Sequence, residues 1–97
     1  MEDFEKMIKG EKPTLVDFYA TWCGPCKMQT PIIEQVKAAV GDTANVIKID
    51  VDRNDELARR YKVQSVPTLI VFRNGEARWR ASGVHQAADL IEQIKRS

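Results

Sequence analysis

The sequence has little of what marks most specialised classes of protein. Its 97 residues include two cysteines and one histidine, and the net charge is only +1. Two cysteines and a distant histidine cannot complete a tetrahedral zinc site within one chain. A near-neutral charge gives no electrostatic basis for binding nucleic acid or an anionic membrane. We therefore expect no metal, no cofactor, no nucleic-acid partner and no membrane partner.

Long apolar runs are also missing. No stretch reaches the length of a membrane-spanning helix. The first twelve residues, MEDFEKMIKGEK, are charged and lack the apolar segment of a signal peptide. We expect a single domain over residues 1–97, a monomeric state and a cytoplasmic location. A periplasmic location would require that a signal segment has been removed.

The alternation of apolar and amphipathic segments predicts an α/β fold. Residues 14–20 and 45–51 have the composition of strands buried on both faces. Asn74-Gly75 predicts a hairpin turn that joins a third strand to a fourth. Right-handed crossovers place the first two strands parallel, the hairpin adds an antiparallel edge, and helices cover both faces. The expected helices are residues 2–9, 25–40 with a kink at Pro31, 52–61 with a cap at Asp52 or Asn54, and 86–96; the hairpin strands are 68–72 and 76–82.

The two cysteines stand three residues apart, as Cys23 and Cys26. A bridge between them closes almost no loop and would add little stability, so the pair is interpreted as chemically active. Gly24 and Pro25 keep the turn short and stiff, and Pro25 suits the first turn of a helix. A helix start favours a thiolate. We expect Cys23, the more exposed, to be the nucleophile with a lowered pKa, and Cys26 to attack the resulting mixed disulfide.

Two charged residues interrupt the predicted strands. A buried carboxylate is costly, so Asp17 either points to water from an edge strand or has a function. Lys48 is either a solvated residue at a strand end or the partner of Asp17. In the second interpretation the two form a partly buried pair, on adjacent central strands, beneath the cysteines.

The segment WCGPCK, residues 22–27, resembles the active-site signature of the thioredoxin family. The resemblance covers nearly the whole chain, because LVDFYATWCGPCKMQTP, VIKIDVD, YKVQSVPTLIVFRNGE and SGV follow in family order. It implies a thioredoxin-like three-layer α/β/α fold and a dithiol–disulfide oxidoreductase that reduces disulfides in other proteins. An NADPH-dependent flavoprotein, thioredoxin reductase, would reduce it in turn. Family members usually have a further strand before the first helix. Here a mixed sheet of about four strands is expected, unless the chain was trimmed.

The resemblance also implies roles for single residues. The acid that matches Asp17 moves protons for Cys26, which requires a raised pKa, and the lysine that matches Lys48 tunes it. The peptide bond between Val66 and Pro67 would be cis and would face the cysteines. It would present the backbone of Val66 to substrate and keep metal ions away from the thiols. The alternative for Pro67 is an ordinary first residue of a strand.

An exposed tryptophan beside a nucleophile suggests an interface, so Trp22 is expected to flank the substrate groove rather than to pack partly in the core. Gly83 is either a plain turn glycine or part of the loop that lines this groove. The predicted substrate-binding residues are Trp22, Gly24, Pro25, Val66, Pro67, Gly83 and Val84. Trp79 is expected to pack against a helix. The residues expected to be solvated and without chemistry are Arg59, Arg60, Arg78, Arg80 and His85.

Two other functions remain open. A thiol oxidase or isomerase of an oxidising compartment could use the same fold, although the Gly-Pro dipeptide resembles that of the reducing members of the family. A thioredoxin-like fold could also serve as a binding module that clamps a larger partner, with or without redox chemistry. A cysteine-free variant that still performed the cellular role would indicate the binding module.

Overall fold

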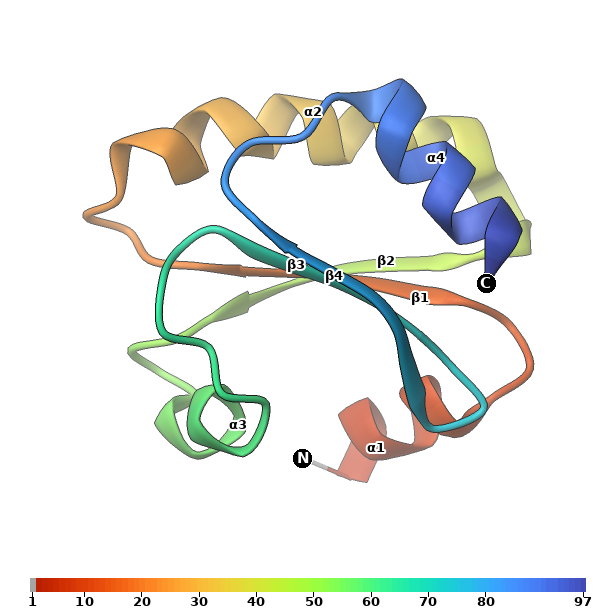
Figure 1. The fold of residues 1–97 in the computed structure, drawn as a ribbon, viewed down its shortest axis with the longest axis horizontal. Coiled ribbons are helices and arrows are strands. Elements are labelled where there is room, and N and C mark those ends of the chain that lie inside the picture. Colours follow the sequence, from red (N-terminus) through yellow and green to blue (C-terminus); the bar gives the residue numbers. More distant parts are fainter. Residues whose placement is uncertain (1) are drawn as a thin grey trace.

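The structure is a computed structural model that describes residues 2–97. Helices and strands alternate along this part of the chain up to a hairpin of two consecutive strands, as the sequence predicts (Figure 1). The elements are α1 (Glu2–Lys9), β1 (Thr14–Tyr19), α2 (Gly24–Val40), a 3₁₀ turn (Gly41–Thr43), β2 (Asn45–Asp50), α3 (Asp55–Arg60), β3 (Thr68–Arg73), β4 (Glu76–Ser82) and α4 (Ala87–Arg96).

The strands form one mixed sheet in the order β2-β1-β3-β4. β1 and β2 are parallel, whereas β3 is antiparallel to both β1 and β4. Within residues 2–97 the sheet has four strands, which confirms the predicted number and the predicted antiparallel edge. The turn between β3 and β4 is the predicted one, and both Asn74 and Gly75 have positive φ values, 53° and 81°, as a type I′ hairpin requires.

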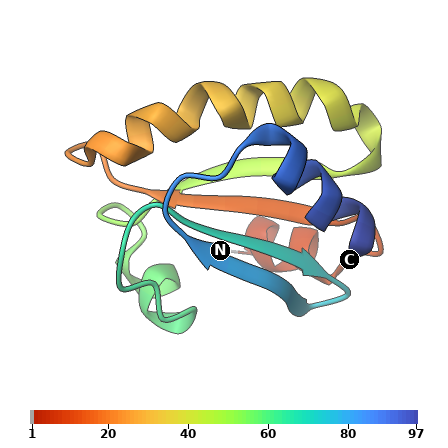
Figure 2. The ribbon, with the colours of Figure 1, turned by 45° about the horizontal axis from the view of Figure 1, so that its top comes forward.

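Helices cover both faces of the sheet, as predicted (Figures 1 and 2). On the face of α2 and α4, Leu15 packs in one apolar cluster with Val36 and Leu90. On the face of α1 and α3, Phe18 packs in a second cluster with Leu57. Because successive side chains of a strand point to opposite faces, β1 contributes to both clusters and is almost entirely buried. The cysteines follow directly on this central strand.

The position predicted for β2 in the sheet is wrong. Its apolar composition predicts a strand buried on both faces in the middle of the sheet, but β2 is an edge strand and most of its residues are only half-buried. The reason is that β2 has a neighbour on one side alone, so one row of its backbone groups is not covered by another strand. Lys48 therefore lies on an edge strand and not on a central one.

Helix α2, which contains Cys26, matches its prediction closely. It runs from Gly24 to Val40, and Gly41 follows as the C-cap, with a φ of 53° in the left-handed region that favours glycine. Pro31 lies inside the helix, and a kink there stays a prediction. The next helix, α3, is shorter than predicted. Asn54 precedes it, but its amide donates to the Asp50 carbonyl and does not cap the helix.

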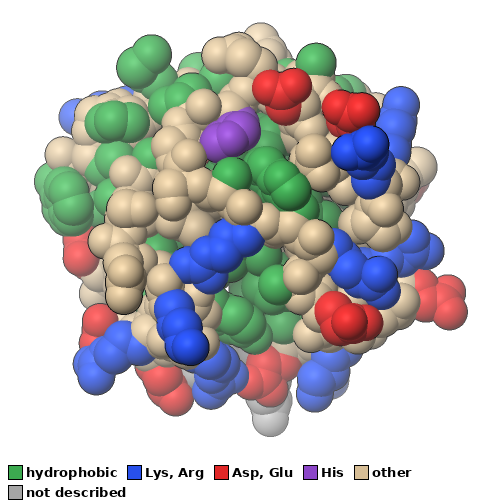
Figure 3. All heavy atoms as spheres, viewed as in Figure 1, with side chains coloured by type: hydrophobic (Ala, Val, Ile, Leu, Met, Phe, Trp, Pro, Cys, Tyr) green, Lys and Arg blue, Asp and Glu red, His purple; other side chains and the backbone are tan. Residues whose placement is uncertain are grey.

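The surface residues assigned no chemistry are mostly as expected. Figure 3 shows charged side chains of both signs interspersed with apolar ones on one face of the molecule. Arg59 pairs with Asp55 in an exposed ion pair. Arg80 is exposed, as expected, and its guanidinium also donates to the carbonyl oxygens of Tyr61 and Lys62 in the chain after α3.

Trp79, on β4, packs against the α2–α4 cluster, which confirms its expected contact with a helix. The predicted last helix is present as α4, and its residues Leu90 and Ile94 are buried in the same cluster. None of the helices formed by residues 2–97 combines the length and the apolar character that crossing a bilayer requires.

Candidate active site

Cys23 and Cys26 form a disulfide where β1 ends and α2 begins. Cys23 is the N-cap of the helix, and its Sγ accepts a hydrogen bond from the Cys26 N–H at 3.1 Å. This N–H is one of those that a helix start leaves without a backbone partner. The local sequence thus places Cys23 Sγ where partial positive charge favours a negative sulfur. Within residues 2–97 no cysteine is free.

The expected difference in exposure between the two cysteines is almost absent. Cys23 is 4% exposed and Cys26 2% exposed. Cys23 is thus the more exposed of the two, as expected, but only by a small margin, and both cysteines are buried in the disulfide form. The cause is a neighbouring loop, because the Val66 carbonyl oxygen lies 3.6 Å from Cys23 Sγ and covers it. The lowered pKa expected for Cys23 stays a prediction.

The loop that covers Cys23 contains the predicted cis peptide bond. The bond between Val66 and Pro67 is cis, as expected. Beyond it, the Gly83 N–H donates to the Pro67 carbonyl at 2.9 Å, so the segment after β4 lies next to this loop. The structure therefore brings together Cys23, Val66, Pro67 and Gly83, which are far apart in the sequence.

Asp17 is fully buried, so the alternative of an edge residue that points to water is wrong. It lies on the central strand β1, and neither of its carboxylate oxygens has a hydrogen-bond partner. Burial raises the pKa of Asp17 from 3.8 to about 6, and the positive charge of Lys48 lowers it in part. A carboxyl group with such a pKa can take up and release a proton near neutral pH.

Lys48 does not form the expected ion pair with Asp17. The two residues are register partners on β2 and β1, yet the Lys48 ammonium donates to Thr30 Oγ1 at 2.8 Å and lies 4.4 Å from the centre of the Tyr19 ring. Thr30 in turn donates to the Cys26 carbonyl at 3.1 Å. A hydroxyl group and an aromatic face thus hold this ammonium on the edge strand. It acts on Asp17 through charge alone.

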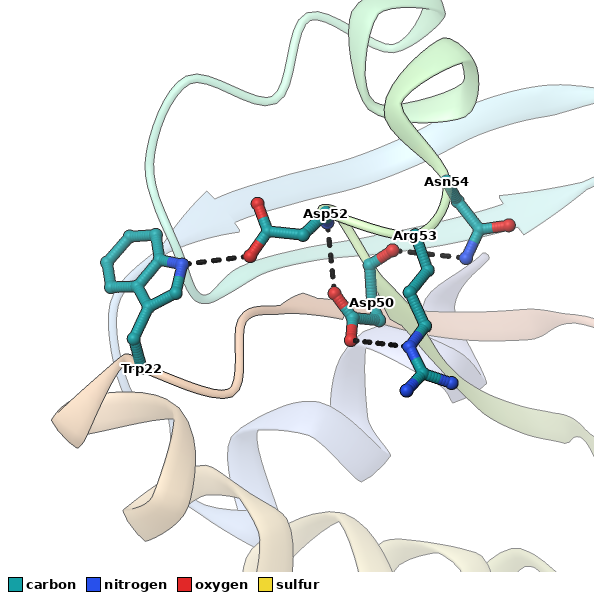
Figure 4. A network of polar contacts seen from close by, with 5 residues as sticks. All are labelled: Trp22, Asp50, Asp52, Arg53 and Asn54. Carbon is teal, nitrogen blue, oxygen red and sulfur yellow. Dashed lines mark hydrogen bonds and ion pairs between the residues drawn. The ribbon is translucent and has the colours of Figure 1, made fainter.

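Trp22 is 71% exposed beside the disulfide, so the alternative of core packing is wrong. Its indole Nε1–H donates to Asp52 Oδ2 at 2.9 Å (Figure 4). Asp50 contacts both residues that follow Val51. Its Oδ1 accepts the Asp52 N–H at 2.9 Å, and its Oδ2 lies 3.9 Å from Arg53 Nε. Sequence reasoning missed this use of Asp52, because no spacing signal connects residues thirty positions apart.

A shallow hollow of about 140 Å³ adjoins Trp22 and Val66, two of the predicted substrate-binding residues. Gly24 and Pro25 lie exposed at the start of α2, while Gly83 and Val84 are half-buried and do not line this hollow. Sequence reasoning missed several of its lining residues. The full lining is Trp22, Val51, Val63, Gln64, Ser65 and Val66.

His85 has more contacts than the solvated residue that was predicted. Its backbone N–H donates to Gln29 Oε1 at 2.8 Å, and its carbonyl oxygen accepts from Gln29 Nε2 at 2.9 Å. Its Nδ1 lies 2.9 Å from the Gly83 carbonyl oxygen, and its ring packs edge-on against Trp79. The imidazole is nevertheless visible at the surface, as the purple group in Figure 3. Sequence reasoning did not single out Gln29.

A cysteine pair that closes into a disulfide at a helix start can exchange two electrons with other disulfides through thiolate attack. The protein is accordingly a dithiol–disulfide oxidoreductase. The family model for thioredoxin matches residues 1–96, and the chain belongs to the thioredoxin family. This family membership, together with relatives named as thioredoxins, identifies a protein-disulfide reductase.

The relatives cover nearly all of this chain. A thioredoxin-like protein of Synechocystis sp. is 49% identical over 94 residues, which are 96% of this chain and 90% of the relative. Thioredoxin Y, chloroplastic, of Oryza sativa is 46% identical over 91 residues, 94% of this chain and 54% of the relative. A bifunctional thioredoxin reductase/thioredoxin of Mycobacterium leprae is 42% identical over 91 residues, 94% of this chain and 20% of the relative.

The fold is that of solved thioredoxins. A thioredoxin mutant of Halobacterium salinarum is 38% identical and superimposes with a TM-score of 0.87. The match includes 99% of this chain and 83% of that structure. The predicted thioredoxin-like fold is therefore confirmed.

Proposed function

We propose that Cys23 is the attacking thiolate and Cys26 the resolving thiol in the reduction of protein disulfides. The single observation that carries this assignment is the position of Cys23 as the N-cap, where its Sγ accepts the Cys26 N–H. The same interaction stabilises a thiolate at Cys23 in the reduced protein. Cys26 lies deeper in the helix and does not have this position.

The proposed reaction has two exchange steps. The Cys23 thiolate attacks one sulfur of the substrate, which forms a mixed disulfide and releases the other sulfur as a thiolate that takes a proton from water. Asp17, directly or through water, then takes the proton of the Cys26 thiol. The Cys26 thiolate attacks Cys23 Sγ, forms the Cys23–Cys26 disulfide and releases the second substrate thiolate. Two electrons pass from the protein to the substrate.

The proposed roles of the other residues follow from their contacts. Asp17 is suited to accept the proton because it is buried, lacks hydrogen-bond partners and has a pKa of about 6. Lys48 keeps that pKa from rising further through its charge. An extended substrate segment would lie against Trp22 and the exposed turn of α2. The proposed groove residues are Trp22, Gly24, Pro25, Val66, Pro67, Gly83 and Val84.

Members of the thioredoxin family act on disulfide substrates and are reduced by thioredoxin reductase. For this chain we propose an NADPH-dependent flavoprotein reductase as electron donor. The fusion of a thioredoxin reductase with a thioredoxin in the Mycobacterium leprae relative supports this pairing. We also propose that residues 1–97 act as one monomeric domain in the cytoplasm, where reducing conditions would supply these electrons.

The test is the reduction of insulin disulfides with dithiothreitol as electron source. The wild-type protein is expected to accelerate the reaction, and Cys23→Ser is expected to reduce the rate to that of dithiothreitol alone, because no thiolate remains at the helix start. Precipitation of the free insulin B chain measures the rate. A Cys23→Ser variant that retained catalysis would show that Cys23 is not the nucleophile.

A further inference from the structure

Gln29 is a completely buried polar side chain, and both ends of its amide are paired with the same residue. Nε2 donates to the His85 carbonyl and Oε1 accepts the His85 N–H. A buried amide is costly unless it is hydrogen-bonded, and here the two bonds run in opposite directions, as between neighbouring strands. Gln29 therefore fastens the backbone of His85 to helix α2, one turn after Cys26.

The segment fastened in this way reaches back to the active site. It joins β4 to α4 and crosses from the sheet to the helix layer beside α2 (Figures 1 and 2). Within it, His85 Nδ1 contacts the Gly83 carbonyl, and the Gly83 N–H donates to the Pro67 carbonyl. The preceding residue, Val66, covers Cys23. A continuous series of contacts thus runs from α2 through this segment to the loop over the disulfide.

We propose that Gln29 is a positioning residue that holds residues 83–85 in place as one wall of the groove for protein disulfides. The inference rests on the proposed function, since it assigns a groove to the same site. Without the Gln29 amide, nothing else on α2 bonds to the His85 backbone in residues 2–97. The segment would then populate other conformations. The apparent affinity for a substrate that needs this wall would fall in proportion to the fraction of molecules that still hold the wall in place.

A small disulfide gives a different expectation. It needs access to Cys23 Sγ but is too short to span the groove from Trp22 to residues 83–85. Its reaction depends on the thiolate at Cys23 and on the resolving thiol, neither of which bonds to Gln29. The Gln29–His85 hydrogen bonds should therefore affect the half-saturating concentration of a protein disulfide and leave the rate of the exchange chemistry nearly unchanged. Insulin and 2-hydroxyethyl disulfide serve as the two probes.

The experiment compares Gln29→Met with Gln35→Met in single turnovers of the pre-reduced protein. Methionine keeps the volume of Gln29 and removes both hydrogen bonds, and Gln35 is an exposed glutamine on the same helix. For Gln29→Met we expect the half-saturating insulin concentration to rise about tenfold. The limiting rate and the rate with 2-hydroxyethyl disulfide should each stay within about twofold of wild type. Gln35→Met should match wild type in all three.

Two results would overturn the inference while the proposed function stands. One is an unchanged half-saturating insulin concentration in a folded Gln29→Met protein. The other is an equal loss with both probes, which would place the effect at the cysteines. If Gln29→Met does not fold, Gln29→Leu removes the same two hydrogen bonds with another apolar side chain of similar volume, and the same comparison applies with the same expected rise of about tenfold. A wild-type protein inactive toward both probes would instead remove the proposed function.

Discussion

Cys26→Ser is expected to convert the protein into a trap that stays covalently attached to its substrates through Cys23. The first exchange needs only the Cys23 thiolate, so the mixed disulfide still forms. Its resolution by Cys26 is an intramolecular attack, and such reactions gain effective concentrations far above those of external thiols. With about millimolar thiol in solution, turnover should fall by at least roughly 10³-fold. Non-reducing gel electrophoresis with insulin as substrate would detect the adduct.

The matched control is Cys23→Ser, which keeps Cys26 and should trap nothing. Cys26 has no acceptor role at the helix start, because the N-cap sulfur that accepts a backbone N–H is that of Cys23, so Cys26 is the poorer first nucleophile. Adducts of Cys23→Ser but not of Cys26→Ser would reverse the two roles. Equal trapping by both variants would mean that the position at the helix start does not distinguish them.

Asp17→Asn is expected to make the oxidised protein more stable at pH 8 by about 3 kcal/mol and to change nothing at pH 4. The pKa of Asp17 is raised to about 6 in the folded protein, so the native state holds this proton more tightly than the unfolded chain does. Wild-type stability is therefore highest below about pH 4, falls as pH rises through about 6, and is level above that. Asparagine is neutral throughout and lacks this fall.

Denaturant unfolding of both proteins at pH 4, 6 and 8 measures the difference. The disulfide form is used because its cysteines do not titrate. A stability difference that is the same at all three pH values would mean that Asp17 is not buried as an unpaired carboxyl group. Asp17→Glu is not a suitable control, because the longer side chain would also change packing around the neutral acid.

The same substitution is expected to slow the reaction more than it weakens binding. Without a proton acceptor, Cys26 must lose its proton to solvent, and the resolving step should slow by about 10²-fold, the low end of general-base contributions. The half-saturating insulin concentration should change little, because no contact places Asp17 in the groove. A wild-type rate in Asp17→Asn would exclude it from the mechanism.

Much of the fold could be predicted from local patterns. The buried strand before the cysteines, the helix that begins at Gly24 and the Asn74-Gly75 hairpin each depend on residues close together in the sequence. The edge position of β2 was not predictable in this way. An apolar strand has the same composition whether one or two strands pair with it, because helices can bury its faces in either case.

In the site, too, features set by nearby residues were predictable and contacts between distant residues were not. Cys23 and Cys26 were found from their spacing, and Asp17 from its charge inside an apolar strand. The partner of Lys48 was predicted wrongly, since the opposite charges of two strands expected to be adjacent suggested Asp17, while Thr30, on another element, accepts from the ammonium. The Gln29–His85 contact joins residues 56 positions apart, and a glutamine on a helix gives no sign of such a bond. The contact exists because the segment between β4 and α4 lies beside α2.

The equilibrium reduction potential of the Cys23–Cys26 pair, titrated against a dithiol buffer, tests the central claim most directly. A value near that known for thioredoxin, roughly −270 mV, is the predicted result and fits a protein that passes electrons to substrate disulfides. A value near roughly −120 mV, as in strongly oxidising disulfide donors, would contradict the account. The protein would then oxidise thiols rather than reduce disulfides.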